Sequence, residues 1–260
     1  MELTDPLNDT AYARLVGDQR SIYFDRRPDG TCDGVPCQPH LLFASRTDAF
    51  AAFGPATDVP FSTMMSFREA PTLTADGLTI VFAGAPDRYA RYATAMYVAT
   101  RATTSEPFSE GVPIASLPGF DEAPYLVPDG SALYFDHSGL GPNPGPHLHR
   151  SKRVNGAYVE PTLVDGIVTD PSVQDRAPVV TPDERVLHFG RLDASGAYQV
   201  WVAKRETTAA PFGPPQRVPE LSTFAFQLPT WISADECEIY LMGTPTWSTP
   251  PAIFRARRPN

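Results

Sequence analysis

One hairpin pattern recurs five times along the chain and constrains its fold more than any other feature of the sequence. In its clearest copy, residues 122–135, apolar and polar residues alternate, break at Pro128-Asp129-Gly130, and alternate again as far as Phe135. Asp-Gly supplies the backbone angles that a tight turn between two short strands requires. The other copies occupy residues 13–24, 69–82, 177–189 and 229–241. Each copy therefore predicts two paired strands.

The spacing of the copies predicts a β-propeller. The residues that end the second strands recur at intervals of roughly fifty to sixty residues, a period typical of propeller blades. These residues are Phe24, Phe82, Phe135, Phe189 and Leu241. A variable loop follows each hairpin, then a third strand that ends in arginine, at residues 40–46, 95–101, 147–153, 199–205 and 252–258. In most units an aromatic segment then leads into a short fourth strand. We expect one all-β domain over residues 1–260: a five-bladed propeller of four-stranded antiparallel blades.

The chain ends predict how the ring closes. The expected blades cover residues 8–60, 61–117, 118–170, 171–223 and 224–260, and the fifth unit stops directly after its third strand. Residues 2–7 resemble the segment that ends the preceding unit, so we expect the N-terminal strand 1–7 to complete the last blade. Pairing the two chain ends removes an open sheet edge and predicts a monomer.

Composition and charge exclude several classes of protein. The chain has 29 prolines, whereas average usage of about 5% would give about 13, and prolines at this density exclude long helices. The net charge of −9 argues against a nucleic-acid surface, which needs clustered Lys and Arg. No apolar run reaches the roughly 20 residues that span a bilayer. The first residues are polar and acidic, unlike a signal peptide. We expect a cytoplasmic protein, or a periplasmic or secreted one if a leader preceding Met1 has been removed.

The repeat residues resemble the WD40-like PD40 repeats of the TolB-type propellers. The resemblance is carried by Pro128-Asp129-Gly130 with Leu133-Tyr134-Phe135, by residues 98–101 (Val-Ala-Thr-Arg) and by residues 211–215 (Pro-Phe-Gly-Pro-Pro), and covers nearly the whole chain. It implies a bacterial envelope or secreted protein, of a kind that often binds other proteins, whereas related propellers include peptidases and lyases. The TolB propeller has six blades, and this chain departs from it with five.

Two residue types recur in every unit and have a structural explanation. Each hairpin turn holds an aspartate and each third strand ends in an arginine, and the topology places both on one face of the ring. The aspartates are Asp18, Asp76, Asp129, Asp183 and Asp235; the arginines are Arg46, Arg101, Arg153, Arg205 and Arg258. We expect an Asp–Arg clamp in every blade, because catalysis needs one asymmetric constellation and not five copies of one pair.

The cysteines and two of the histidines are weaker sequence signals, for a disulfide and for a metal site. Cys32 and Cys37 share a turn-rich loop and can form a small disulfide in an oxidising compartment, with free thiols as the alternative; Cys237 is expected in a strand. His147 and His149 alternate on one strand, a spacing that suits zinc or copper. Further ligands are not evident, so we interpret them as packed histidines and predict no metal and no cofactor.

Function is expected at the end of the channel where the first strands begin, which we call the loop mouth because the loops between second and third strands open there. Its residues do not repeat, as expected of a specific site on a repetitive scaffold. As a binding module for a protein, a peptide or a carbohydrate, the chain would use mixed charges and aromatics. The ligand-binding candidates are Arg68, Asp121, Arg176, Gln227, Arg91, Tyr92, Asp136, Arg191 and Trp247.

The alternative is a hydrolase or lyase of glycosidase type. Glu69, Glu122 and Asp175 would then be converging carboxylates, one of which needs a raised pKa to act as an acid, and His137 beside Asp136 is a further candidate base. The chain contains no nucleophile elbow, no His-Glu-x-x-His and no phosphate loop. Binding is therefore the favoured hypothesis. If all three carboxylates prove to be paired with Arg68, Arg176 or Arg191, the hydrolase hypothesis fails.

Overall fold

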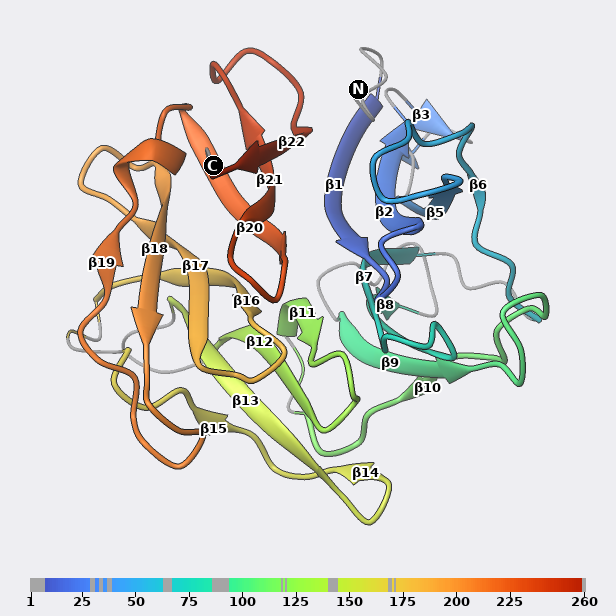
Figure 1. Ribbon diagram of the computed structural model, residues 1–260, viewed down its shortest axis with the longest axis horizontal. Helices are drawn as coiled ribbons and strands as arrows, with labels where there is room; N and C mark the ends of the chain where they lie inside the picture. Colours follow the sequence, from blue (N-terminus) through green and yellow to red (C-terminus); the bar gives the residue numbers. More distant parts are fainter. Residues whose placement is uncertain are drawn as a thin grey trace.

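Five antiparallel sheets follow one another in chain order around a ring (Figure 1). The computed structural model describes residues 8–28, 31–32, 35–36, 39–62, 67–85, 94–117, 119, 121–139, 145–167, 170 and 172–258. Within each sheet the first strand lies innermost and the following strands step outward, each paired with its neighbour. The structure therefore confirms the predicted all-β, five-bladed propeller.

The strands have the following bounds. The first blade contains β1 (Asn8–Leu15), β2 (Ser21–Pro28), β5 (His40–Ser45) and β6 (Thr57–Asp58). The second contains β7 (Phe67–Leu73), β8 (Thr79–Ala85), β9 (Ala95–Thr100) and β10 (Val112–Pro113). The third contains β11 (Asp121–Leu126), β12 (Ala132–Ser138), β13 (Pro146–Val154) and β15 (Thr162–Leu163), with β14 (Ala157–Tyr158) beside the end of β13. The fourth contains β16 (Asp175–Val180), β17 (Val186–Leu192), β18 (Tyr198–Lys204) and β19 (Gln216–Arg217), followed by the 3₁₀ turn η1 (Pro219–Leu221).

The fifth blade has three strands in the described part of the chain: β20 (Phe226–Ile232), β21 (Glu238–Thr244) and β22 (Ala252–Arg257). The predicted closing strand, residues 1–7, lies outside the described residues. Blades one and five nevertheless meet, because the Thr10 N–H donates to the Pro251 carbonyl at 3.2 Å. Side chains of β1 and β2 share one apolar cluster with Tyr240 and Met242 of β21. Packing between the first and last blades thus closes the ring.

The short fourth strands are anchored by the residue that follows them. The two paired residues of each fourth strand are exposed in the first four blades. The next residue is apolar and its N–H donates to the third strand of its own blade at 2.9 Å in each of the first four blades. These anchors are Val59, Ile114, Val164 and Val218. The outer strand therefore needs one buried side chain and no apolar run.

The repeated turns differ from the expected Asp–Arg clamp. Each aspartate accepts from the N–H two residues later in its own turn, as in Asp76 to Leu78 at 2.9 Å. Three of the arginines donate instead to the carbonyl of the residue after the aspartate: Arg101 Nε reaches the Gly77 oxygen at 2.9 Å, and Arg46 and Arg205 do likewise. Arg153 differs, because its Nε donates to the Gly156 carbonyl at 3.1 Å. The prediction of a direct Asp–Arg contact was wrong, because the aspartate is already used to fix its own turn.

The same arginines also tie the outer segments and neighbouring blades together. The guanidinium of Arg101 stacks 4.3 Å from the ring centroid of Phe108, and Arg46 and Arg205 stack on Phe53 and Phe212. Arg101 further donates to the hydroxyl of Tyr23 in the preceding blade at 3.1 Å. One arginine therefore fixes a turn, an outer aromatic and, in this case, an adjacent blade.

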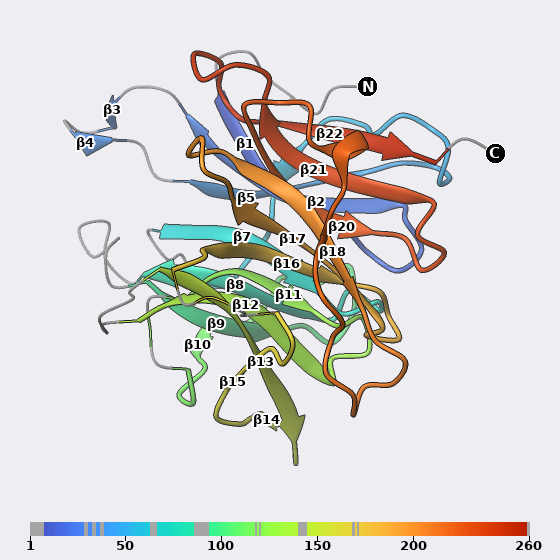
Figure 2. The same cartoon turned by 90° about the vertical axis from the view of Figure 1, so that its left-hand side faces the viewer.

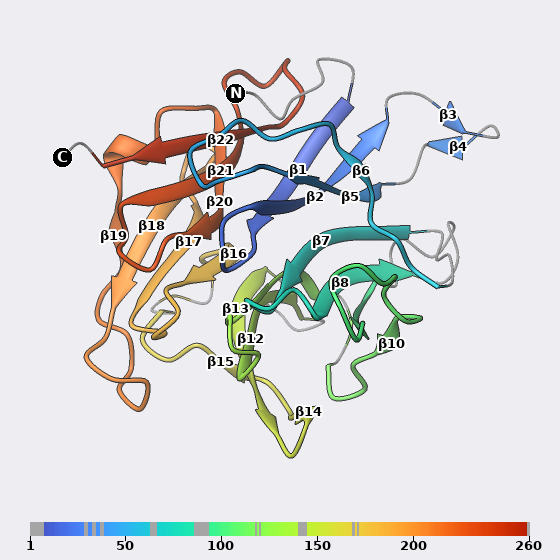
Figure 3. The ribbon, with the colours of Figure 1, turned by 45° about the vertical axis from the view of Figure 1, so that its right-hand side comes forward.

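Two further features complete the frame. The β3 (Thr31–Cys32) and β4 (Val35–Pro36) strands form a ribbon that projects beyond the blades (Figures 2 and 3). Cys37 lies outside the described residues, so the predicted disulfide between Cys32 and Cys37 stays a prediction. Cys237 is an exposed free thiol in the turn before β21, not in the strand as expected. Among the described residues, no helix has the length and apolarity needed to cross a bilayer.

Candidate functional site

A bulge in the innermost strands shapes the loop mouth. In β1, β7, β11 and β16 the pairing register shifts, and the bulged residue has a left-handed backbone with φ between 47° and 51°. These residues are Tyr12, Ala70, Ala123 and Ala177. Asp25 accepts from the Ala70 N–H at 3.2 Å, and Asp136 accepts from the Ala177 N–H at 2.9 Å. In both cases an aspartate on the second strand of one blade accepts a hydrogen bond from the bulge of the next blade and so stabilises that bulge.

The residue before each bulge supplies the charged groups of the mouth. This position is occupied by Glu69, Glu122 and Arg176 in three successive blades, and by Ala11 and Leu228 in the other two. Arg176 donates to Glu122 at 2.7 Å, so the ion pair joins blades three and four. Although burial opposes it, the charges of Asp136 and Glu122 raise the pKa of Arg176. The pair is accessible, with 41% of the Glu122 side chain exposed.

Glu69 is the most perturbed acid of the mouth. Burial, together with the nearby charges of Asp25 and Glu122, raises its pKa from 4.5 to about 8. Among the described residues its ion-pair partner is Arg27, at a distance of 3.7 Å, and 19% of its side chain is exposed. Glu69 is therefore largely protonated near neutral pH and can donate a proton or a hydrogen bond.

Two buried acids and a tyrosine lie next to these groups. Burial raises the pKa of Asp25 to about 6 and that of Asp136 to about 7, against the opposing effects of the amide bonds and neighbouring arginines. Tyr12 has a pKa raised by burial and then by the charges of Asp136, Glu122 and Glu69. Because the pKa of one phenol is raised by acids from two neighbouring blades, these side chains surround a single mouth. Sequence reasoning missed Tyr12, although it stands where three other repeats have alanine.

Several other predicted site residues are buried and held within their own blades. Asp175 forms two hydrogen bonds with Arg191, at 2.7 and 2.9 Å, and only 1% of its side chain is exposed. Asp121 is likewise buried and lies 2.8 Å from Nδ1 of His137. The Gln227 side-chain oxygen accepts from two N–H groups of the preceding loop, at 2.7 and 3.0 Å. These residues form the inner wall that supports the mouth.

Two of the remaining predicted residues, Arg68 and Trp247, differ in their exposure. Arg68 is buried and its guanidinium lies 4.5 Å from the ring centroid of Phe61. Trp247, in the loop between β21 and β22, is 67% exposed. Arg91 and Tyr92 lie outside the described residues.

The histidine pair on β13 is packed against other rings. His149 stacks on Phe135 and meets the edge of His137, with ring centroids 5.9 and 5.3 Å apart. Burial lowers the pKa of His149, which favours its neutral form. In the part of the chain that the structure describes, no three metal-binding side chains come together.

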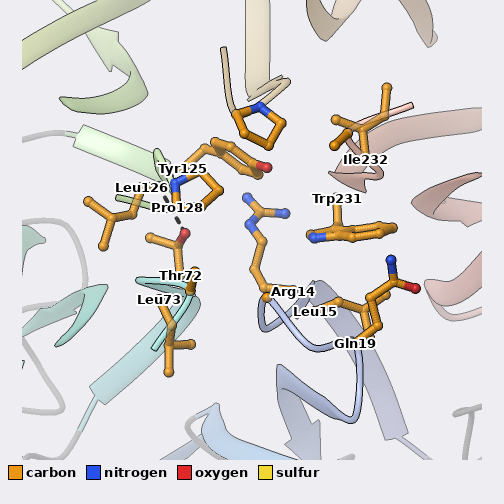
Figure 4. Close-up of a pocket in the computed structure, with 14 residues that line it drawn as sticks. Arg14, Leu15, Gln19, Thr72, Leu73, Tyr125, Leu126, Pro128, Trp231 and Ile232 are labelled. Atoms are coloured by element: carbon orange, nitrogen blue, oxygen red, sulfur yellow. Dashed lines mark hydrogen bonds between the residues drawn. The ribbon is translucent and has the colours of Figure 1, made fainter. Parts of the chain in front are cut away.

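The opposite end of the channel, which we call the turn mouth, contains a cavity of about 250 Å³. Hairpin-turn residues of all five blades line it: Gly17, Ala75, Pro128, Pro182 and Ala234. Below them the side chain of Arg14 lies between Tyr125 and Trp231 (Figure 4). Sequence reasoning missed this cavity, because it treated the turn face as purely structural.

Comparison with known proteins supports the fold. No family model matches the sequence, and no curated protein matches it. Among solved structures, a β-1,2-mannobiose phosphorylase from Listeria innocua has 10% identity and a TM-score of 0.63, with 97% of this chain and 95% of that chain covered. A putative TolB from Agrobacterium tumefaciens has 12% identity and a TM-score of 0.54, with 92% and 71% covered. TolB from Acinetobacter baumannii has 12% identity and a TM-score of 0.50 over 96% of this chain. This chain spans about half the length of that protein, 55%. The fold resemblance to TolB-type propellers, expected from the repeats, is confirmed at the level of structure.

Proposed function

We propose that this protein is a binding module that receives a protein, peptide or carbohydrate ligand at the loop mouth. The observation that supports the proposal best is the accessible ion pair between Glu122 and Arg176, with Glu69 beside it. All three occupy one equivalent position of the repeat, where a purely structural role would favour similar residues in every blade. Instead, charge is concentrated on three successive blades and absent from the equivalent positions Ala11 and Leu228.

The charges of this mouth favour a ligand that is polar but uncharged. Arg176 and Glu122 compensate each other at 2.7 Å, so a ligand need not bring a charge of its own. Together with protonated Glu69 they offer both donors and acceptors, which suits vicinal hydroxyls or peptide groups. The similar Listeria innocua structure is a complex with β-1,2-mannobiose, and this makes oligosaccharides the first ligands to test.

A thermal-shift screen against oligosaccharides, peptides and divalent metals tests the proposal. We expect an oligosaccharide or peptide to raise the melting temperature, and Glu122→Gln to weaken its binding by about tenfold, because one charge-assisted contact is lost. Glu110→Gln is the matched control, since Glu110 is exposed on the outside of the second blade. Equal weakening by both variants, or unchanged affinity in Glu122→Gln, would contradict a site at the loop mouth.

Hydrolysis is the second candidate, because Glu69 combines a pKa raised to about 8 with partial exposure. A carboxylic acid that is protonated at neutral pH is what a glycosidase uses as its general acid. Glu122 would be the second carboxylate, although Arg176 holds it in an ion pair. Asp175 is fully engaged by Arg191, so it is a weaker candidate than the sequence suggested. His137 is similarly held beside Asp121.

Catalysis and binding can be separated with a ligand found in the screen. If the protein is a hydrolase, Glu69→Gln abolishes turnover of that ligand while its dissociation constant changes little. The wild-type rate should then fall as the pH rises through about 8, where Glu69 loses its proton. A ligand that binds the wild type and is recovered intact after prolonged incubation would exclude hydrolysis.

A further inference from the structure

A buried arginine without a salt bridge among the described residues lies beside the cavity of the turn mouth. Arg14 is 2% exposed, and its strand β1 is innermost in the first blade. Its Nη1 donates to the Thr230 carbonyl of blade five, and its Nη2 donates to the Pro124 carbonyl of blade three at 3.1 Å. A guanidinium has five N–H donors, so these two bonds leave donors to spare. Its Nε has no hydrogen-bond partner within the described residues.

Among the described residues, no carboxylate lies within salt-bridge distance of Arg14, and the charge of Asp25 acts on it only from farther away. The salt bridges formed among the described residues do not include it. Burial lowers its pKa to about 10, partly offset by Tyr125, Tyr12 and Asp25, so it stays charged at neutral pH. The ring of Tyr125, whose centroid is 5.2 Å away, stabilises a cation but does not neutralise it. A buried charge without a counter-ion in direct contact is costly, which makes this position suited to binding an anion.

The cavity beside Arg14 limits the size and chemistry of that anion. Its volume of about 250 Å³ is equivalent to about eight waters, at about 30 Å³ each. Its walls are mostly apolar and include Leu15, Leu126, Trp231 and Ile232 (Figure 4). The hydroxyl of Thr72 accepts from the Leu126 N–H at 2.9 Å, and its own O–H is a neutral donor beside the cation. One cation among apolar walls matches one negative charge on a short apolar group.

We propose that the turn mouth is a binding site for a small carboxylate, whose oxygens accept hydrogen bonds from Arg14 while its carbon chain lies against Trp231 and Leu126. The site is separate from the loop mouth and does not depend on the function proposed there. A phosphate fits less well, because its second charge would have no partner among the residues that line the cavity. The carboxylate enters between the exposed turn residues Gly17, Ala75, Pro182 and Ala234.

Binding can be observed directly at Arg14 by NMR of ¹⁵N-labelled protein. We expect butyrate and benzoate to shift the Arg14 Nε–Hε resonance in a saturable manner, whereas the neutral isostere butyramide and inorganic phosphate leave it in place. Fluorescence of the whole protein supplies a second readout, since Trp231 lines the cavity.

Variants then assign the binding to the guanidinium. Arg14→Met should weaken carboxylate binding at least tenfold, because a hydrogen bond to a charged group contributes about 1.5–3 kcal/mol. Arg217→Met, on an exposed outer strand, is the matched control and should bind like the wild type. If Arg14→Met does not fold, the wild-type titration still decides. No shift with any carboxylate up to 100 mM, or equal binding of butyrate and butyramide, would overturn the proposal.

Discussion

Replacing Glu69 by glutamine should change how the stability of the protein depends on pH. Burial and the charges of Asp25 and Glu122 raise the pKa of Glu69 from 4.5 to about 8 in the folded protein. The folded chain therefore retains a proton that the unfolded chain releases, and the stability of the wild type falls as the pH rises between these two values. Glutamine has nearly the same shape but no titration, so Glu69→Gln should lose this dependence.

The size of the effect follows from the two pKa values. Each tenfold change in an ionisation constant corresponds to about 1.4 kcal/mol, so ionising Glu69 in the folded state costs up to roughly 5 kcal/mol. Because 19% of the side chain is exposed, solvent screening reduces this cost, and we expect about 3 kcal/mol. Glu69→Gln should therefore gain that much stability relative to the wild type between pH 4.5 and pH 9.

Urea unfolding of both proteins at half-unit pH intervals measures the effect. The difference in unfolding free energy should change by no more than about 1.4 kcal/mol per pH unit, the limit for one proton, and then level off above about pH 8. Any constant offset from burying an amide cancels in this comparison. Glu110→Gln, on an exposed position, should show no such dependence. A flat difference between Glu69→Gln and the wild type would show that Glu69 ionises normally, and the argument for a protonated acid in the mouth would fail.

Two further predictions concern the frame. Gly166→Ala should destabilise the protein by about 3 kcal/mol or more, because the new Cβ would lie 1.9 Å from the Phe212 carbonyl oxygen. The control Gly196→Ala has a similar φ of +82° but open space around it, so it should cost only about 1 kcal/mol. Similar urea midpoints for the two variants would refute the clash. Glu184→Gln should lose about 2–4 kcal/mol at pH 7, because Glu184 accepts from Arg150 at 2.7 and 2.8 Å and from Tyr134 at 2.6 Å. Burial opposes these contacts but the pKa of Glu184 is still lowered, so the loss should shrink as the pH falls below about 4.5, which urea titrations at pH 7 and pH 3.5 would reveal.

The fold could be predicted from the sequence because its determinants are local. Each turn is fixed by an aspartate that accepts from an N–H two residues away, and such contacts are visible as a repeated motif. The partner of the arginine could not be predicted in the same way. Arg101 meets the Gly77 carbonyl and Phe108, and a backbone oxygen leaves no trace in the identity of a residue.

The sequence predicted which residues lie at the loop mouth but not the contacts that they make, and the role of this mouth as the functional site stays a prediction. Repeat alignment identified Glu69, Glu122 and Arg176 as residues that differ between blades, and their contacts depend on which blade lies next in the ring. Glu122 and Asp175 have the same charge, yet one is accessible beside Arg176 and the other is buried with Arg191. A single-residue step along the strand separates these outcomes, because alternate residues face opposite sides of the sheet.

The innermost strand of the first blade, β1, carries one side chain near each mouth of the channel. At the positions where β7 has Ala70 and Thr72, β1 has Tyr12 and Arg14. The pKa of Tyr12 is raised by burial and by the charges of the acids at the loop mouth, whereas Arg14 lies beside the cavity of the turn mouth. Both residues have a structural cost: Tyr12 has a left-handed backbone that alanine tolerates better, and Arg14 buries a charge. Natural sequences depart from their own structural rules mainly at functional positions. The departures at Tyr12 and Arg14 therefore agree with the two sites that we propose at the loop mouth and at the turn mouth.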